Sequence, residues 1–304
     1  MSEVNYIKII FSFMTFSIIL MGSLINSFEK YLPVFLKQCF RYGKFAYKGK
    51  TTRLKPVEVP KAWFRHFYVY SSILTIATLI LAIAVLIFNV SVPRKILNIL
   101  DAAGGTNRKA TVTSVSALLA LTLLTIQCCR RMYDTHFVSV FGKTSRMNLS
   151  HYLIGFIHYT GAVFAILVEA PRFSRSYGVV FRWIDLTYID VVAALFFLWA
   201  NWHQYKATVI LANLRKDKKG SIITDVHKLP CGDWFEYVSS PHLLAEILMY
   251  FALTVILRNN VTWLYIFAWV LSNQVETALL SHWWYKETFS DFPKQRRAII
   301  PFIY

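Results

Sequence analysis

The stretch FYVYSSILTIATLILAIAVLIF occupies residues 67–88 and contains no charged residue. A run of about 20 apolar residues can cross the hydrocarbon core of a bilayer as a helix, which pairs its own backbone polar groups. We therefore interpret this stretch as a transmembrane helix. Similar stretches occur on both sides of it, and together they predict seven spans, at residues 6–25, 67–88, 110–127, 152–170, 186–203, 242–257 and 261–281.

The composition of the chain agrees with a membrane protein. Hydrophobic residues make up 56% of the 304 residues, whereas soluble domains usually contain about 45–50%. No stretch shows the alternation that is typical of a membrane β-barrel. We predict an all-α membrane protein with about seven transmembrane helices, arranged as a single domain over residues 1–304. Span 6–25 is not followed by a small-residue cleavage site, so we interpret it as a retained anchor.

The net charge of +17 is unevenly distributed. When the loops are assigned alternately to the two sides of the membrane, 24 Lys and Arg residues fall on the side of the C-terminus and 9 on the other. Loops rich in Lys and Arg usually stay in the cytosol, which predicts a cytosolic C-terminus. This placement beside the spans favours membrane lipid over nucleic acid as a partner. The sequence leaves the oligomeric state open.

Familiar cofactor and metal motifs are absent from the sequence. The four cysteines show no metal-ligand spacing, so we expect no metal site. The glycine-rich nucleotide fingerprints and the serine-hydrolase and zinc-protease motifs do not occur either. A nucleotide would therefore have to bind in a pocket made by the helices and their loops.

Polar side chains inside predicted spans suggest where such a pocket lies. Such residues are costly in lipid and suggest function, although hydrogen bonding between helices is the alternative. Basic residues at the same membrane level suit either an anionic ligand or lipid headgroups. The polar residues are Asn201, His203, Glu246, Asn273, Gln274, Glu276 and His282, with Tyr285 one turn after His282, and the basic residues are Arg215, Lys216, Arg296 and Arg297.

Several blocks of the sequence resemble the steroid 5α-reductase family, and within it the polyprenol (polyprenal) reductase branch. The most specific blocks are LPCGDWFEYVSSPHLLAEIL (229–248) and HWWYKETFSDFPKQRRAIIPFIY (282–304). Further blocks are VPKAWFRHFY (59–68), RRMYDTHFVSVF (130–141) and HQYKATVILANLRKDKKG (203–220). The resemblance implies a seven-span reductase of the endoplasmic reticulum membrane that takes NADPH from the cytosolic side, with residues 186–304 as its catalytic and cofactor half.

The resemblance also implies roles for individual residues. Glu58 corresponds to the carboxylate that holds the substrate carbonyl. Three positions depart from the steroid-acting members: Arg131 replaces a tyrosine, His242 replaces an asparagine, and Ser281 replaces a histidine. The proton donor therefore stays open among Tyr133, His66 and Tyr68. The family's cofactor contacts fall on Arg215, Glu246, Tyr285 and Arg296, with Asn201 and His282 as further candidates and His242 in place of an asparagine.

The chemistry of the reaction narrows the substrate. Hydride adds to a carbon–carbon double bond when the resulting charge can spread onto an oxygen, as in an α,β-unsaturated aldehyde. We therefore expect the substrate to be a long-chain polyprenal, reduced to dolichal, rather than polyprenol. For Glu58 to donate a proton to the developing oxyanion, we expect it to be buried in an apolar pocket. The alternatives are a 3-oxo-Δ4-steroid 5α-reductase, a seven-span receptor, and a membrane methyltransferase or carrier.

Overall fold

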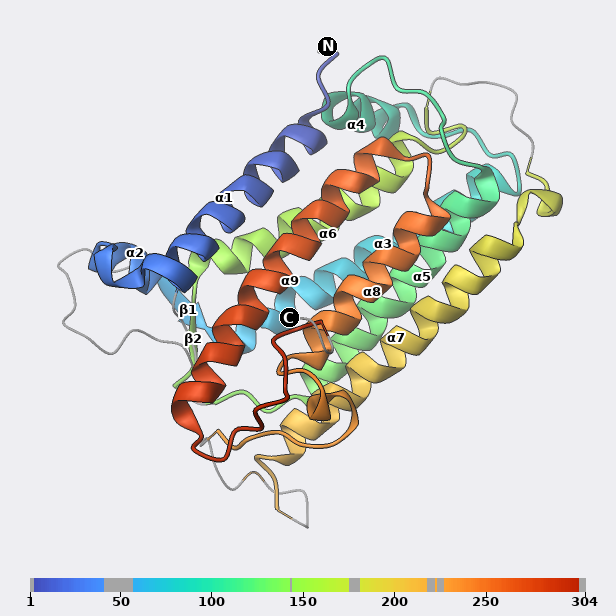
Figure 1. The fold of residues 1–304 in the computed structure, drawn as a ribbon. Helices are drawn as coiled ribbons and strands as arrows, with labels where there is room; N and C mark the ends of the chain where they lie inside the picture. Colours follow the sequence, from blue (N-terminus) through green and yellow to red (C-terminus); the bar gives the residue numbers. More distant parts are fainter. Residues whose placement is uncertain are drawn as a thin grey trace.

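The computed structural model describes residues 3–40, 57–142, 144–174, 181–217, 222 and 227–300. In this part of the chain, seven helices of 16 to 28 residues form one bundle (Figure 1). Each overlaps one of the seven predicted spans. They are α1 (Tyr6–Phe28), α3 (Phe64–Leu86), α5 (Ser114–Tyr133), α6 (Leu149–Val168), α7 (Tyr188–Asn213), α8 (Pro241–Ile256) and α9 (Val261–Thr288).

Four segments of the described chain are long and apolar enough to cross a membrane. They contain α1, α3, α5 and α6, and α8 is a shorter apolar helix. The helices α7 and α9 carry polar residues within their length, among them Asn201 and Glu276. The structure therefore agrees with a multi-pass membrane protein of helical class.

Shorter elements connect the long helices. Helix α2 (Val34–Phe40) follows α1, and α4 (Arg94–Gly104) lies between α3 and α5. Strands β1 (Glu58–Pro60) and β2 (Arg146–Asn148) pair in antiparallel register, with Val59 opposite Met147.

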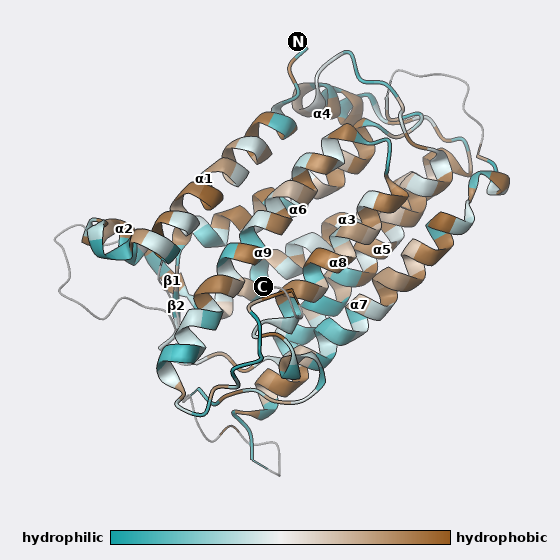
Figure 2. Ribbon diagram, viewed as in Figure 1, coloured by the Kyte–Doolittle hydropathy of each residue, from teal (hydrophilic) through white to brown (hydrophobic). Residues whose placement is uncertain are grey.

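Consecutive long helices run in opposite directions, so the connections separate into two groups (Figure 1). The N-terminus and α4 lie at one end of the bundle, and α2 and the two strands lie at the other (Figure 1). The lower ends of α7 and α9 lie at this second end, and hydrophilic residues gather there (Figure 2).

Apolar side chains fill the bundle interior and also cover part of its outside. Leu121 and Leu124 of α5 and Ile166 of α6 are fully buried. Phe13 and Phe16 of α1, by contrast, are 70% and 65% exposed. Large exposed apolar side chains along a helix match a surface that lipid covers.

Close contacts hold α1 against its neighbours. Gly161 of α6 faces the buried ring of Phe11, where an added Cβ would lie 2.2 Å from Cε2. On the other side of α1, the carboxylate of Glu276 accepts hydrogen bonds from Asn26 Nδ2 at 2.7 Å and Ser23 Oγ at 3.3 Å. For Glu276, the alternative of hydrogen bonding between helices is therefore confirmed.

Candidate active site

Two sequence blocks that are far apart in the chain meet beside the end of α9. Val238 and Arg297 form a parallel bridge. The Ser239 amide donates to the Arg297 carbonyl at 2.9 Å, and the Arg297 amide donates to the Tyr237 carbonyl at 2.8 Å. The segment after α9 is thereby fixed against the segment that precedes α8.

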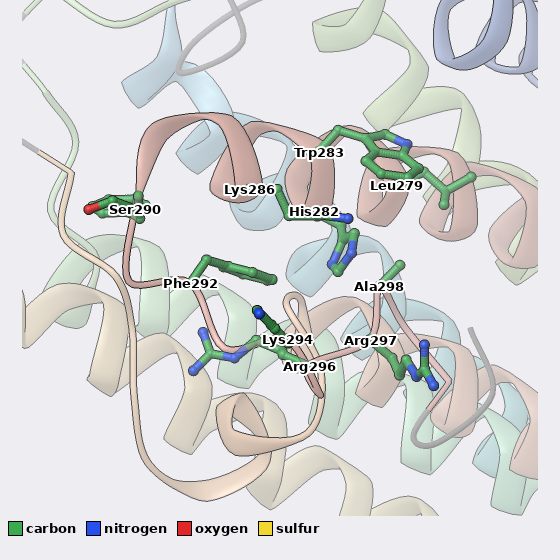
Figure 3. Close-up of a pocket in the computed structure, with 11 residues that line it drawn as sticks. Leu279, His282, Trp283, Lys286, Ser290, Phe292, Lys294, Arg296, Arg297 and Ala298 are labelled. Carbon is green, nitrogen blue, oxygen red and sulfur yellow. The ribbon is translucent and has the colours of Figure 1, made fainter.

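This junction borders a cavity of about 450 Å³, which we call the cationic pocket. Figure 3 shows its lining, which comes from the last turns of α9 and from the segment that follows. Among the described lining side chains, four are basic and none is acidic. The lining residues are Leu279, His282, Trp283, Lys286, Phe289, Ser290, Phe292, Lys294, Arg296, Arg297 and Ala298.

Arg296 is the most deeply buried cation of this pocket, at 2% exposure. Its Nη1 donates to the Pro230 carbonyl at 3.0 Å, and its guanidinium lies 5.5 Å from the centre of the Phe292 ring. Its Nε and Nη2 have no hydrogen-bond partner among the described residues. A buried cation with free N–H groups is costly unless an anion pairs with it. The planar guanidinium suits a phosphate oxygen.

His282 and Tyr285 flank Arg296 on the last turns of α9. His282 Nδ1 lies 2.9 Å from Ser239 Oγ, and its ring packs edge-on against Phe292. Tyr285 is 5% exposed and lies stacked with Phe292. The structure therefore brings together three of the predicted cofactor residues, namely Arg296, His282 and Tyr285.

Arg215 lies just beyond α7 and outside the pocket lining. Its Nη1 donates to the Val140 carbonyl at 2.6 Å, and its Nη2 lies 3.2 Å from His227 Nε2. The His227 ring packs against Trp284, the neighbour of Tyr285, at 5.3 Å. Arg215 therefore connects to the end of α9 through His227.

A second group of polar side chains lies inside the bundle, and we call it the polar network. It joins α3, α5, α7 and α8 through side-chain hydrogen bonds. The members are Tyr68 of α3, Gln127, Arg130 and Arg131 of α5, Asp134 directly after α5, Gln204 of α7 and Glu246 of α8.

Glu246 forms one side of the polar network. Its Oε1 accepts from Gln127 Nε2 at 2.8 Å, and its Oε2 accepts from Gln204 Nε2. The Gln204 oxygen in turn accepts from Arg130. Each carboxylate oxygen of the half-buried Glu246 therefore has a hydrogen-bond donor.

Asp134 forms the other side of the polar network and is fully buried. Its Oδ2 accepts from Arg130 and, at 3.2 Å, from Arg131 Nη1. Arg131 also donates to the Tyr68 hydroxyl from Nη2 at 3.1 Å and from Nε at 3.4 Å. Asp134 thus pairs with both arginines of the network, whereas Glu246 accepts from the neutral side chains of Gln127 and Gln204.

The remaining predicted cofactor residues lie next to the polar network. Asn201 is 7% exposed, and its Nδ2 lies 3.4 Å from the Met249 sulfur. The backbone carbonyl of His242 accepts from Gln204 Nε2 at 3.0 Å. His203 lies further outward, where it pairs with Asp233 at 2.9 Å and stacks on Trp234.

Among the described contacts, none joins the three catalytic candidates Glu58, His66 and Tyr133 to one another. Glu58 is exposed and lies opposite Asn148 in the strand pair. His66 is exposed, and its Nδ1 lies 3.2 Å from the Tyr152 hydroxyl. Tyr133 is 50% exposed and packs against Phe137. The prediction that Glu58 is buried in an apolar pocket is therefore wrong, because the short strand pair holds it at the surface of the bundle.

Sequence reasoning missed most of the polar network. It counted Arg130 and Arg131 as loop charges because the third span was predicted to end at residue 127. The helix continues to Tyr133, and both arginines pair with Asp134 inside the bundle. The spacing of Arg130 and Asp134, four positions apart, is typical of an ion pair on one helical face and could have indicated this contact. Nothing in the sequence marked Gln127 or Gln204.

Comparisons with known proteins place the chain among reductases. Residues 172–304 match the family of 3-oxo-5-alpha-steroid 4-dehydrogenases. Over 306 residues, the chain is 40% identical to a polyprenal reductase of Drosophila melanogaster, covering 99% of this chain and 94% of the relative. It is 32% identical to the polyprenal reductase of Homo sapiens, over 87% of this chain and 84% of that relative. It is 33% identical to the polyprenal reductase of Caenorhabditis elegans, over 86% of this chain and 85% of that relative.

Proposed function

Because the chain belongs to the steroid 5α-reductase family of oxidoreductases, we propose that it reduces the α,β-double bond of a long-chain polyprenal with NADPH, giving dolichal. The observation that carries this proposal is the cationic pocket, in which buried Arg296 has two N–H groups without a partner among the described residues. A phosphate-bearing nicotinamide cofactor supplies the anion that this arginine requires.

The residues of the pocket fit the parts of NADPH. The phosphate groups suit Arg296 and the other three lining cations, while the rings of Trp283 and Phe292 offer apolar faces for its flat rings. The resemblance also assigns Glu246 and Asn201 to the cofactor, and we propose that they orient its reactive end from the polar network and its neighbourhood inside the bundle. We assign Arg215 and His227 the task of holding the segment that borders Trp284.

The reaction needs a hydride, a proton and a group that stabilises the aldehyde oxygen. When bound, NADPH supplies the hydride and its two electrons to the β-carbon. The protein holds the aldehyde oxygen as it gains negative charge. Each well-placed hydrogen-bond donor stabilises this charge by about 3 kcal/mol. Delivery of one proton to the α-carbon completes dolichal. The balanced reaction is polyprenal, NADPH and a proton giving dolichal and NADP⁺.

A membrane setting suits this substrate. We propose seven spans, a cytosolic C-terminus and residence in the endoplasmic reticulum. Support comes from the 24-to-9 division of Lys and Arg and from the gathering of β1, β2 and the C-terminal segment at one end of the bundle. The isoprenoid tail then stays in lipid or between helices while its aldehyde reaches the polar end.

Incubation of the purified protein with NADPH and a short polyprenal tests the proposal. We expect loss of NADPH absorbance together with an equal amount of dolichal. Absence of NADPH oxidation, with binding of a methyl donor instead, would overturn the reductase assignment in favour of a methyltransferase. A receptor would bind its ligand without turnover.

A steroid is the second candidate substrate, because the matching family is described by a 3-oxo-steroid reaction. The same assay with a 3-oxo-Δ4-steroid decides between the two. Arg131 stands where the resemblance places a tyrosine in steroid-acting members, so we expect polyprenal to have the higher kcat/KM. A higher kcat/KM with the steroid would replace the proposed substrate.

A further inference from the structure

Burial separates the three side chains that the sequence leaves open as proton donor. Tyr133 is 50% exposed, and His66 is exposed and lies beside Tyr152. Tyr68 is 8% exposed and belongs to the polar network. A group that transfers a proton to a charged intermediate works best where water is excluded, because each electrostatic interaction there is stronger. Of the three candidates, Tyr68 is the one that lies in such a buried environment.

The hydrogen bonds of Tyr68 leave its proton uncommitted. Its hydroxyl oxygen accepts two N–H groups of Arg131, at 3.1 Å and 3.4 Å. The guanidinium also lies over the Tyr68 ring, 5.0 Å from its centre. A guanidinium has only donors, so the Tyr68 O–H cannot be donated to Arg131. Among the described residues this O–H has no other acceptor, and it remains free to donate to a bound ligand.

We propose that Tyr68 donates the proton of the reduction and that Arg131 is its positioning residue. This assignment rests on the proposed function. As hydride adds to the β-carbon, the Tyr68 O–H hydrogen-bonds the aldehyde oxygen; its proton then passes to the resulting enolate, and the phenolate regains a proton from water. The electron pair of the hydride ends in the new C–H bond at the β-carbon. The enol then returns to the aldehyde: water gives one proton to the α-carbon, and the enol oxygen releases the proton that it took from Tyr68.

Arg131 is suited to stabilise the phenolate that this step leaves. It already directs two N–H groups at the phenol oxygen, and charge-assisted hydrogen bonds of this kind are roughly twice as strong as neutral ones. Its own place is fixed by Asp134, which is fully buried and also binds Arg130. The positive charge therefore stays beside Tyr68 throughout turnover.

The polar network also connects Tyr68 to the proposed cofactor side. From Arg131 the contacts continue through Asp134 and Arg130 to Gln204, which donates to Glu246. Tyr68 on α3 and Glu246 on α8 thus belong to one continuous polar region. Delivery of a proton and a hydride to one substrate requires the two groups to lie close together.

Tyr68→Phe tests the proposal, because it removes the O–H and keeps the ring. We expect kcat with polyprenal to fall by about 100-fold or more, while the Kd for NADPH changes less than about threefold. The matched control is Tyr70→Phe on the same helix, whose hydroxyl lies 2.7 Å from Thr160 Oγ1 and which also loses a hydrogen bond. We expect its kcat to stay within about threefold of wild type.

Arg131 variants distinguish positioning from simple structural support. We expect Arg131→Met to lower kcat by about tenfold or more and Arg131→Lys to restore part of the loss, with the Kd for NADPH unchanged in both. In wild type the product should carry one solvent deuterium at the α-carbon in D₂O, with a solvent isotope effect on kcat. That isotope effect should change in Arg131→Met.

The outcomes separate this inference from the proposed function. If wild type does not reduce polyprenal, the proposed function fails. If wild type is active and Tyr68→Phe keeps its kcat, while Tyr133→Phe or His66→Gln loses it, the Tyr68 assignment is overturned. If Tyr68→Phe does not fold, fluorotyrosine at position 68 replaces it. Its more acidic phenol should change kcat and the solvent isotope effect, and unchanged values of both also overturn the proposal.

Discussion

The Ser239 hydroxyl lies 2.9 Å from Nδ1 of His282 and joins the segment before α8 to the last turns of α9. The two residues are separated by 43 positions in the sequence. His282 also lines the cationic pocket, so this hydrogen bond fixes one wall of the pocket. The backbone bridge between Val238 and Arg297 fixes the opposite side of the same junction.

Removing this hydrogen bond should loosen the pocket wall. We expect Ser239→Ala to weaken NADPH binding by about threefold to tenfold, because one side-chain hydrogen bond contributes about 0.5–1.5 kcal/mol. Titration of NADPH monitored by protein fluorescence measures this effect. Ser272→Ala is the control, since the Ser272 hydroxyl donates to the Ala268 carbonyl of its own helix at 2.8 Å. Equal Kd values for the two variants would contradict the role of Ser239.

Arg296 should have the largest effect on cofactor affinity. We expect Arg296→Ala to weaken NADPH binding by roughly 10- to 100-fold, since a charge-assisted hydrogen bond contributes about 1.5–3 kcal/mol. Isothermal titration with NADPH measures the change. Arg182→Ala is the matched control. Arg182 forms an ion pair with Asp185, and the Arg182 side chain is 67% exposed. Unchanged affinity in Arg296→Ala would rule out Arg296 as the phosphate ligand.

Glu246→Gln should destabilise the bundle and lower turnover together. The new amide group would direct donors at Gln127 or Gln204, which now donate to the carboxylate. An unsatisfied buried donor costs about 1–3 kcal/mol, so we expect the Tm to fall by several degrees. Thermal unfolding in detergent measures this, with the exposed Glu287→Gln as control. A Tm equal to that of the control would show that the polar network does not need the charge of Glu246.

The contact between α1 and α6 leaves no room for a larger residue at position 161. We expect Gly161→Ala to lower the free energy of unfolding by about 1–3 kcal/mol, because its Cβ would overlap the buried Phe11 ring. The second-site change Phe11→Leu should recover part of that loss, which a double-mutant cycle measures. Additive losses in the double variant would show that the two residues do not meet.

Substitutions of Glu58 and Arg215 should affect turnover and cofactor binding differently. We expect Glu58→Gln to lower kcat, since the resemblance places Glu58 at the substrate carbonyl. The Kd for NADPH should stay unchanged, since Glu58 lies on β1 and outside the cationic pocket. Arg215→Ala should weaken NADPH binding by less than Arg296→Ala does, because Arg215 acts on the end of α9 through His227 and Trp284. Parallel measurement of kcat and of the Kd for NADPH checks both. The reverse pattern would exchange the two roles.

The positions of the long helices followed from the sequence. Helix α6 was predicted at 152–170 and lies at Leu149–Val168, and α8 was predicted at 242–257 and lies at Pro241–Ile256. The bilayer sets the length of an apolar run, so hydropathy alone locates such helices. Their ends were less certain. Helix α7 was predicted to end at 203 and continues to Asn213. Hydropathy ends a span at its polar residues, even where neighbouring helices provide hydrogen-bond partners for them.

The tertiary structure alone decided which side chains meet. The sequence named Glu246, Tyr285 and Arg296 through a resemblance, but it gave no sign that Arg296 would keep two N–H groups without a partner. It left Tyr68 as one of three equal candidates, and only the packing of α3 against α5 places Arg131 on its hydroxyl. Apolar length is a local property that can be read along the chain. Pairing between buried polar groups depends on the rotation and spacing of neighbouring helices, which no single segment encodes.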